Sequence, residues 1–245
     1  MYILAIETTG PNGSATLINE YGKPVSHRVS HESMSHLKDL IPMIEEMTGE
    51  LKITGDDISA VSCSIGPGSF TGIRIGVSTA RALAQAWGKP CVAASSLTSF
   101  VHRRGREEGL REDDVICAIL NARRHQVYGF VEGLMKAGPY MIEDVLKVIM
   151  ENVTEGRRVV FYGDGVDAYE SIIRETLGET VDYVFAPKES RYQDAADIAL
   201  AGLEKFRAGD TVHYSELLPD YMREAEAEQK LKAGELPISR LPKQE

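Results

Sequence analysis

The sequence feature that most constrains the fold is a strand that runs directly into a glycine-rich turn and then into a long helix. Residues 58–65 (ISAVSCSI) are apolar and rich in β-branched side chains, as in a buried strand, and the turn GPGSFTG follows. A helix is predicted from about Phe70 to Trp87, ending at Gly88, because glycine commonly terminates helices in a left-handed conformation. Strand, turn and helix in this order are typical of α/β proteins.

The first half of the chain contains further strands and a second helix. Apolar segments separated by turn residues predict strands at 2–9, 14–20, 25–30 and 89–96. Residues 33–48 place apolar side chains at helical spacing on one face, which predicts a helix with a kink at the internal Pro42. That face contains Met34, Leu37, Leu40, Ile41, Ile44 and Met47.

The second half repeats the order of the first with different spacings. Residues 115–132 form a predicted hairpin, and the strand 157–165 runs into a second glycine turn followed by a helix. The chain is therefore expected to be a diverged duplication with two mixed sheets, each flanked by helices. We predict a first lobe at 1–108, a second at 109–218 and a C-terminal extension at 219–245, whose last dozen or so residues are expected to be mobile; the charged stretch 102–114 is expected to be part helix and part connection.

Composition indicates a cytoplasmic protein that does not bind nucleic acid unaided. The chain has no apolar run long enough to span a membrane and no basic leader at its start. Its three cysteines lie in apolar segments without a CxxC pair, so they are expected to be buried and reduced. The formal net charge of −10 opposes binding to a polyanion.

The glycine turn matches neither common phosphate-binding code. No Gly-Lys-Ser/Thr follows at the Walker A offset, and Thr71 stands where a dinucleotide fingerprint has its third glycine. A glycine turn at a helix start can still hold an anion on backbone N–H groups, with Ser69 and Thr71 as caps or ligands. The residues considered for anion or nucleotide contact are Gly66, Pro67, Gly68, Ser69, Phe70, Thr71 and Arg74.

The helix after the turn carries a stripe of small residues. Gly72, Gly76, Ala80 and Ala84 recur every four residues, and glycine in mid-helix costs about 1 kcal/mol relative to alanine, so close packing is expected along this side. Two alternatives stay open: packing on the chain's own sheet, or packing against a partner. The predicted partner interface comprises His36, Leu37, Leu40, Ile41, Ile44, Gly72, Ile73, Gly76, Val77 and Ala80.

Several segments together resemble the TsaB (YeaZ) family over nearly the whole chain. They are ILAIETT, HLKDLIPMIEEM, GPGSFTGIRIG, NARRHQVY, YGDG and PDYMR. The resemblance implies an actin-like, hexokinase-like (ASKHA) α/β fold of two duplicated lobes. It also implies a non-catalytic partner of the related protein TsaD in threonylcarbamoylation of adenosine 37 in tRNAs that read codons starting with A.

The resemblance implies no catalytic residue, metal or cofactor in this chain. A TsaC-type synthase would make the intermediate, TsaD would carry the metal and the transfer, TsaE would supply an ATP-driven reset, and tRNA would be met only through the complex. Glu7 and Asn121 stand where the family commonly has Asp, and Ser96 and Phe100 replace the paired metal histidines of TsaD-like proteins. Whether the chain alone forms a homodimer is left open.

Two enzymatic alternatives remain at this point: a nucleotide-dependent phosphotransferase of the same fold, and a metallopeptidase. His31 and His36 are five residues apart, which makes surface or capping roles a better interpretation than a metal site. Ser69 has no base evident in the sequence.

Overall fold

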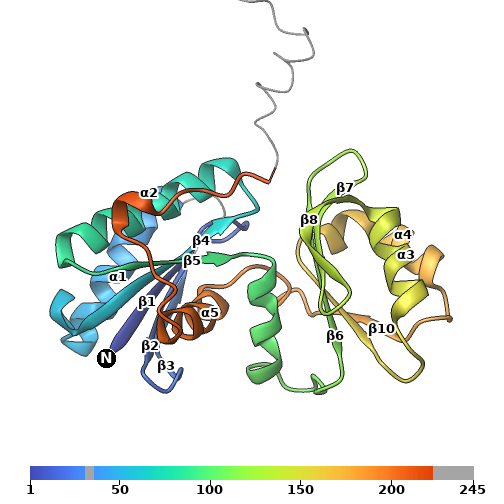
Figure 1. The fold of residues 1–245 in the computed structure, drawn as a ribbon, viewed down its shortest axis with the longest axis horizontal. Coiled ribbons are helices and arrows are strands. Elements are labelled where there is room, and N and C mark those ends of the chain that lie inside the picture. Colours follow the sequence, from blue (N-terminus) through green and yellow to red (C-terminus); the bar gives the residue numbers. More distant parts are fainter. Residues whose placement is uncertain (31–35, 223–245) are drawn as a thin grey trace, which may run out of the picture.

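Two lobes lie side by side in the computed structural model, each built on a five-stranded mixed sheet (Figure 1). The structure describes residues 1–30 and 36–222, and within the first helix the side chains of His36 and Leu37 are not among those described. The predicted helix start at 33–35, the metal alternative at His31 and the predicted mobile tail therefore lie outside the described residues.

The first sheet has the strand order β3-β2-β1-β4-β5. Strand β1 pairs antiparallel with β2 and parallel with β4, so the opening hairpin and a crossover strand share one sheet. The strands are β1 (Tyr2–Glu7), β2 (Ser14–Asn19), β3 (Pro24–Val29), β4 (Ile58–Gly66) and β5 (Cys91–Ser95).

Helices cover both faces of this sheet. Successive side chains of β1 point to opposite faces and are buried on both, so each face must be covered. Leu4 and Ile6 pack with α1 (His36–Leu51) and α2 (Phe70–Trp87), whereas Ile3 and Ala5 pack with α5 (Ala195–Arg207) on the opposite face. The lobe boundaries expected from the sequence assign α5 to the second lobe, but its apolar face lies on the first sheet. The chain therefore returns to the first lobe after completing the second.

The second sheet repeats the arrangement in the order β10-β9-β6-β7-β8. Its strands are β6 (Val115–Asn121), β7 (Gln126–Val131), β8 (Met135–Met141), β9 (Val159–Tyr162) and β10 (Tyr183–Phe185), and one face packs on α3 (Ile142–Asn152) and α4 (Gly165–Leu177). Read from its other end, this order corresponds strand by strand to that of the first sheet. The duplicated α/β, actin-like fold expected from the sequence is thereby confirmed.

Short helical turns connect these elements: η1 (Gly55–Asp57), η2 (Thr98–Gly105) and η3 (Tyr214–Glu216). Helix α2 has the predicted bounds, and Gly88 ends it in the left-handed conformation at φ 63°. Helix α1 continues through Pro42 to Leu51, further than predicted. Strands β8 and β10 were not foreseen, because both are short or interrupted by glycine and proline.

Candidate functional site

The GPGSFTG turn packs against the end of β1. The Ser69 N–H donates to the Thr9 carbonyl at 2.8 Å, and the Ser69 side chain accepts from the Gly72 N–H at 3.2 Å, so Ser69 caps α2. Gly68 has a φ of 151°, and a Cβ there would lie 2.5 Å from the Thr9 carbonyl oxygen. Gly68 is therefore required for close approach between the β1–β2 loop and the turn that precedes α2.

The predicted interface stripe on α2 is buried within the monomer, which corrects its assignment to a partner surface. A Cβ at Gly72 would lie 1.9 Å from the Thr8 carbonyl oxygen, and one at Gly76 would lie 2.4 Å from Thr8 Oγ1. The same correction applies to the other residues of the predicted interface that lie in the core, which are Leu40, Ile44, Ile73, Val77 and Ala80, all at most 3% exposed. Of that set, Ile41 is 39% exposed and is the one accessible described side chain.

The outer surface of α2 exposes a different set of small residues. Ser78, Ala82 and Ala86 are all exposed and follow one another at four-residue intervals. This second stripe is displaced from the buried one by two positions, which on a helix is roughly the opposite side. Only the buried stripe was identified from the sequence, because the glycines that indicate close packing lie there; the exposed stripe has the same four-residue spacing.

An aromatic and cationic cluster lies at the start of α2. The Phe70 ring is 4.7 Å from that of Tyr221, and the Arg74 guanidinium lies 4.0 Å above the Phe70 ring while its Nε donates to Tyr221 Oη at 3.0 Å. Phe70 and Arg74 thus anchor the 219–222 segment of the chain, a role the sequence did not indicate.

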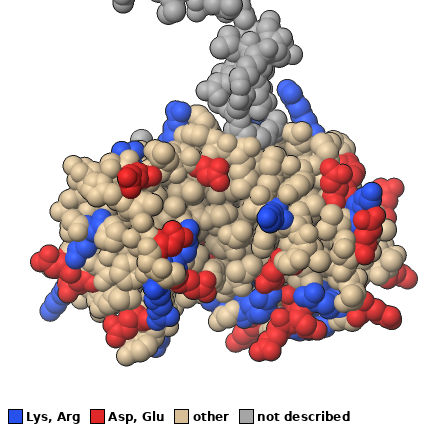
Figure 2. Space-filling model, in the orientation of Figure 1, with Lys and Arg blue, Asp and Glu red and all other residues tan. Residues whose placement is uncertain are grey.

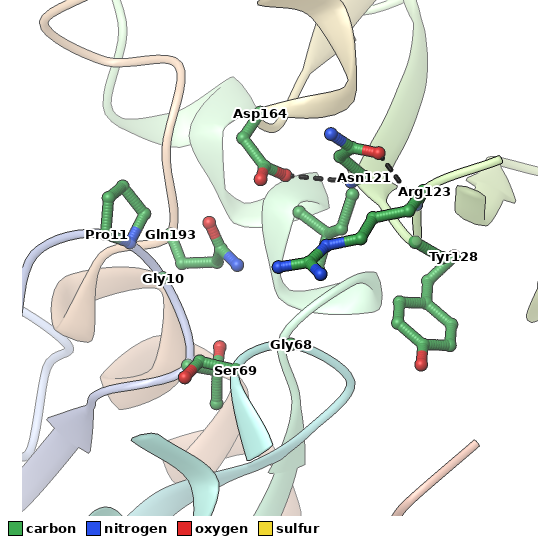
Figure 3. Close-up of a pocket in the computed structure, with 12 residues that line it drawn as sticks. Gly10, Pro11, Gly68, Ser69, Asn121, Arg123, Tyr128, Asp164 and Gln193 are labelled. Carbon is green, nitrogen blue, oxygen red and sulfur yellow. Dashed lines mark hydrogen bonds between the residues drawn. The ribbon is translucent and has the colours of Figure 1, made fainter. Parts of the chain in front are cut away.

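A cleft of about 350 Å³ lies between the lobes and is lined from both of them (Figure 3). Of the seven turn residues considered for anion contact, Gly68 and Ser69 line it, whereas Gly66, Pro67, Phe70, Thr71 and Arg74 do not. The remaining lining residues are Thr9, Gly10, Pro11, Leu120, Asn121, Ala122, Arg123, Tyr128, Asp164 and Gln193. Most of these were missed from sequence because they come from five separate segments.

The turn between β6 and β7 presents Arg123 to this cleft. Arg123, Arg124 and His125 have φ values of 64°, 52° and 61°, a left-handed conformation that is costly for residues other than glycine. The Asn121 side chain accepts from the Arg123 N–H at 2.8 Å and stabilises the turn. Asn121 therefore has a local structural role at the position where the family commonly has Asp.

Two acidic residues, Glu7 outside the cleft lining and Asp164 within it, have carboxylate oxygens that accept hydrogen bonds from backbone N–H groups. Glu7 is fully buried and does not line the cleft; burial raises its pKa, although one carboxylate oxygen accepts from the Thr9 N–H. Burial also raises the pKa of Asp164, whose Oδ1 accepts from the Asn121 N–H at 3.0 Å. Within residues 1–30 and 36–222, no cluster of three His, Cys, Asp or Glu side chains could hold a metal ion.

Ser96 and Phe100, the residues expected to replace the TsaD-like histidines, are both buried. The Ser96 hydroxyl donates to the Pro67 carbonyl and is fully buried. Phe100 stacks on Tyr162 with ring centroids 5.3 Å apart. Ser96 therefore fixes the GPGSFTG turn within the first lobe, whereas Phe100 packs the connecting segment on the second lobe.

Comparison with known proteins agrees with this geometry. The model of the TsaD family, described as tRNA N6-adenosine threonylcarbamoyltransferase, matches residues 30–231. The tRNA threonylcarbamoyladenosine biosynthesis protein TsaB of Bacillus subtilis is 30% identical over 238 residues, covering 94% of this chain and 97% of that protein. The TsaB protein of Escherichia coli is 27% identical over 241 residues, covering 96% and 100%. The solved structure of YeaZ from Pseudomonas aeruginosa has a TM-score of 0.68 at 24% identity, covering 90% of this chain and 99% of that one, and so shares the fold.

The two duplicated lobes and the cleft between them define a protein of the actin-like class. The extent and identity of these matches show more narrowly that the chain belongs to the TsaB (YeaZ) family. No helix in the part of the chain that the structure describes is long and apolar enough to cross a membrane.

Proposed function

We propose that this chain is a non-catalytic subunit that binds TsaD and thereby supports threonylcarbamoyl transfer to adenosine 37 of tRNA. Its family supports the pathway, since the relatives from B. subtilis and E. coli are named as tRNA threonylcarbamoyladenosine biosynthesis proteins. The match to the TsaD family model over residues 30–231 supports a common fold for the two partners.

The observation that carries the partner role is the outer face of α1 and α2. Both helices pack on the same face of the first sheet; α2 exposes Ser78, Ala82 and Ala86, and α1 exposes the apolar Ile41. Small side chains let a second helix approach closely, while an exposed apolar residue gains from burial. We therefore place TsaD on this face, in place of the buried glycine stripe. A second copy of the chain could use the same face when TsaD is absent.

We assign the chemistry to the partner for two reasons: the environment of Glu7, and the residues found at the positions considered for catalysis or metal binding. Glu7 is buried, Asn121 stabilises a turn, Ser96 bonds the Pro67 carbonyl within the first lobe, and Phe100 stacks on Tyr162 of the second. In this proposal ATP, Mg²⁺ and the catalytic metal reside on TsaD, TsaE and the TsaC-type synthase. On the face shown in Figure 2, acidic and basic side chains are interspersed, which supports contact with tRNA through the complex rather than by this chain alone.

Reconstitution of tRNA modification tests the proposal. Threonine, bicarbonate, ATP and tRNA are incubated with a TsaC-type synthase, TsaD and TsaE, with or without this chain, and modified adenosine is measured by mass spectrometry. Product should require both TsaD and this chain. Modified tRNA formed by this chain without TsaD would refute the proposed division of labour.

The phosphotransferase alternative draws on one observation, the cleft between the lobes. Thr9 Oγ1 and Gln193 Oε1 are buried there without a hydrogen-bond partner in the described part of the chain. Turnover of MgATP by the purified chain, without TsaD or TsaE, would favour this alternative over the subunit role.

A further inference from the structure

The buried guanidinium of Arg103 joins the two segments that cross between the lobes, beside the more exposed Arg106, which pairs with Asp194. The first crossing includes η2, which leads from β5 to β6, and the second runs from β10 back to α5 through residues 186–194. Arg103 lies near the end of η2, in the middle of the first crossing, and is 4% exposed. From this position its side chain contacts both crossings.

Four of the five N–H groups of Arg103 donate hydrogen bonds: two to the second crossing, one to the first crossing and one to α5. Its Nη1 donates to the Ser190 carbonyl at 2.8 Å and its Nη2 donates to the Tyr192 carbonyl at 2.7 Å, both on the second crossing. Its Nε pairs with Asp197 of α5 at 2.5 Å, and Nη1 also pairs with Glu107 at 2.8 Å.

The neighbours of Arg103 attach this centre to each lobe separately. Glu107 accepts from the Tyr162 hydroxyl of β9 at 2.9 Å, in the second lobe. Asp197, 1% exposed, lies on the helix that covers the first sheet and also pairs with Arg106. On the second crossing, the Arg191 carbonyl accepts from the Gly163 N–H at 2.7 Å, and the Arg191 side chain pairs with Asp167 of α4 at 2.6 Å.

Two-lobed proteins commonly close about hinges in the segments that join the lobes, and a ligand in the cleft supplies the energy. Here a rotation of one lobe would move the Ser190 and Tyr192 carbonyls relative to Asp197 and break buried, charge-assisted hydrogen bonds. We propose that Arg103 locks the hinge, so that the angle between the lobes is set by the chain itself and needs no ligand in the cleft.

The lock is tested by measuring a distance between the lobes. Spin labels are placed on Gln85→Cys in α2 and Lys147→Cys in α3, at exposed positions, while the native cysteines are buried. Pulsed electron paramagnetic resonance should give one narrow distribution of distances between the two labels in the otherwise unaltered chain. The distribution should be the same with and without millimolar MgATP.

Arg103→Met should show a second set of distances between the lobes. In the parent protein, molecules with these distances should make up less than about a tenth of the population. Arg104→Met is the matched control, because Arg104 pairs with Glu132 and the Asp114 carbonyl and reaches neither the second crossing nor α5. It should leave the distribution unchanged. Arg103→Lys keeps the charge beside Asp197 but lacks the planar fork that reaches two carbonyls, so it should also broaden the distribution.

Three results would overturn the lock. The first is a folded Arg103→Met or Arg103→Lys protein with the parent distribution, and the second is a shift of the parent distribution on addition of MgATP. The third is loss of folding in both variants without a folded species of altered lobe distance, which would make Arg103 a core residue only.

Discussion

Replacing Gly72 with alanine tests whether the glycines of α2 are required by internal packing. A methyl group there would lie 1.9 Å from the Thr8 carbonyl oxygen, so α2 and the end of β1 must separate by about 1 Å. The separation also strains the bond from Thr8 Oγ1 to the Gly72 carbonyl, which is 2.7 Å long and buried. Overpacking and a weakened buried hydrogen bond outweigh the helix propensity gained, leaving a net loss of about 2 to 4 kcal/mol.

Gly49→Ala is the matched control for this change. Gly49 lies in α1, and a Cβ added there would meet no neighbouring atom within 4 Å, so alanine should stabilise the protein by up to about 1 kcal/mol. Thermal unfolding followed by circular dichroism should show Gly72→Ala melting about 5 to 15 °C below the parent, and Gly49→Ala slightly above it. A Gly72→Ala protein as stable as the parent would refute the packing argument.

Three further results are expected from the same geometry. Gly76→Leu should lower the melting temperature of the isolated chain, because its side chain would meet Thr8 in the core; a stable monomer that has lost only partner binding would contradict this. Burial raises the pKa of Glu7 in the folded protein, so its contribution to stability is present below the pKa of the unfolded chain and is lost as pH rises through the pKa of the folded protein. Glu7→Gln does not titrate and should therefore become more stable relative to the parent as pH increases. Urea unfolding at several pH values measures this difference. Burial raises the pKa of Cys91 to about 11 and the other two thiols are also buried, so alkylation at pH 8 should be far slower in native than in denatured protein, as followed by mass spectrometry.

The bounds of α2 were predictable because Ser69 and Gly88 are strong local signals for a helix start and end. The duplicated sheets followed from repeated apolar segments. The burial of Gly72 and Gly76 could not be predicted, since a small-residue stripe has the same spacing whether it faces the chain's own sheet or a partner. Contact with Thr8 distinguishes the two, and it depends on how β1 and α2 meet in three dimensions.

The cleft and the hinge were beyond sequence reasoning for a related reason. Arg103 and Asp197 are 94 positions apart. Every residue has a backbone carbonyl, so the sequence does not indicate that those of Ser190 and Tyr192 accept from Arg103. The charged 102–114 stretch was expected to be part helix and part connection, and no buried residue joining the lobes was predicted there. Burial of Arg103 is visible only after the chain has returned to the first lobe with α5.

The most direct test of the subunit role is the affinity of TsaD for variants of the outer α2 face. Ala82→Arg places a charge at the centre of the proposed contact, whereas Ala208→Arg places the same charge at an exposed alanine just after α5, on the opposite face of the first sheet. By isothermal titration calorimetry, Ala82→Arg should weaken TsaD binding by about tenfold or more, with the melting temperature of the chain unchanged, and Ala208→Arg should bind as the parent does. Parent-like affinity of Ala82→Arg, or equal loss in both variants, would contradict the proposed docking of TsaD on α1 and α2.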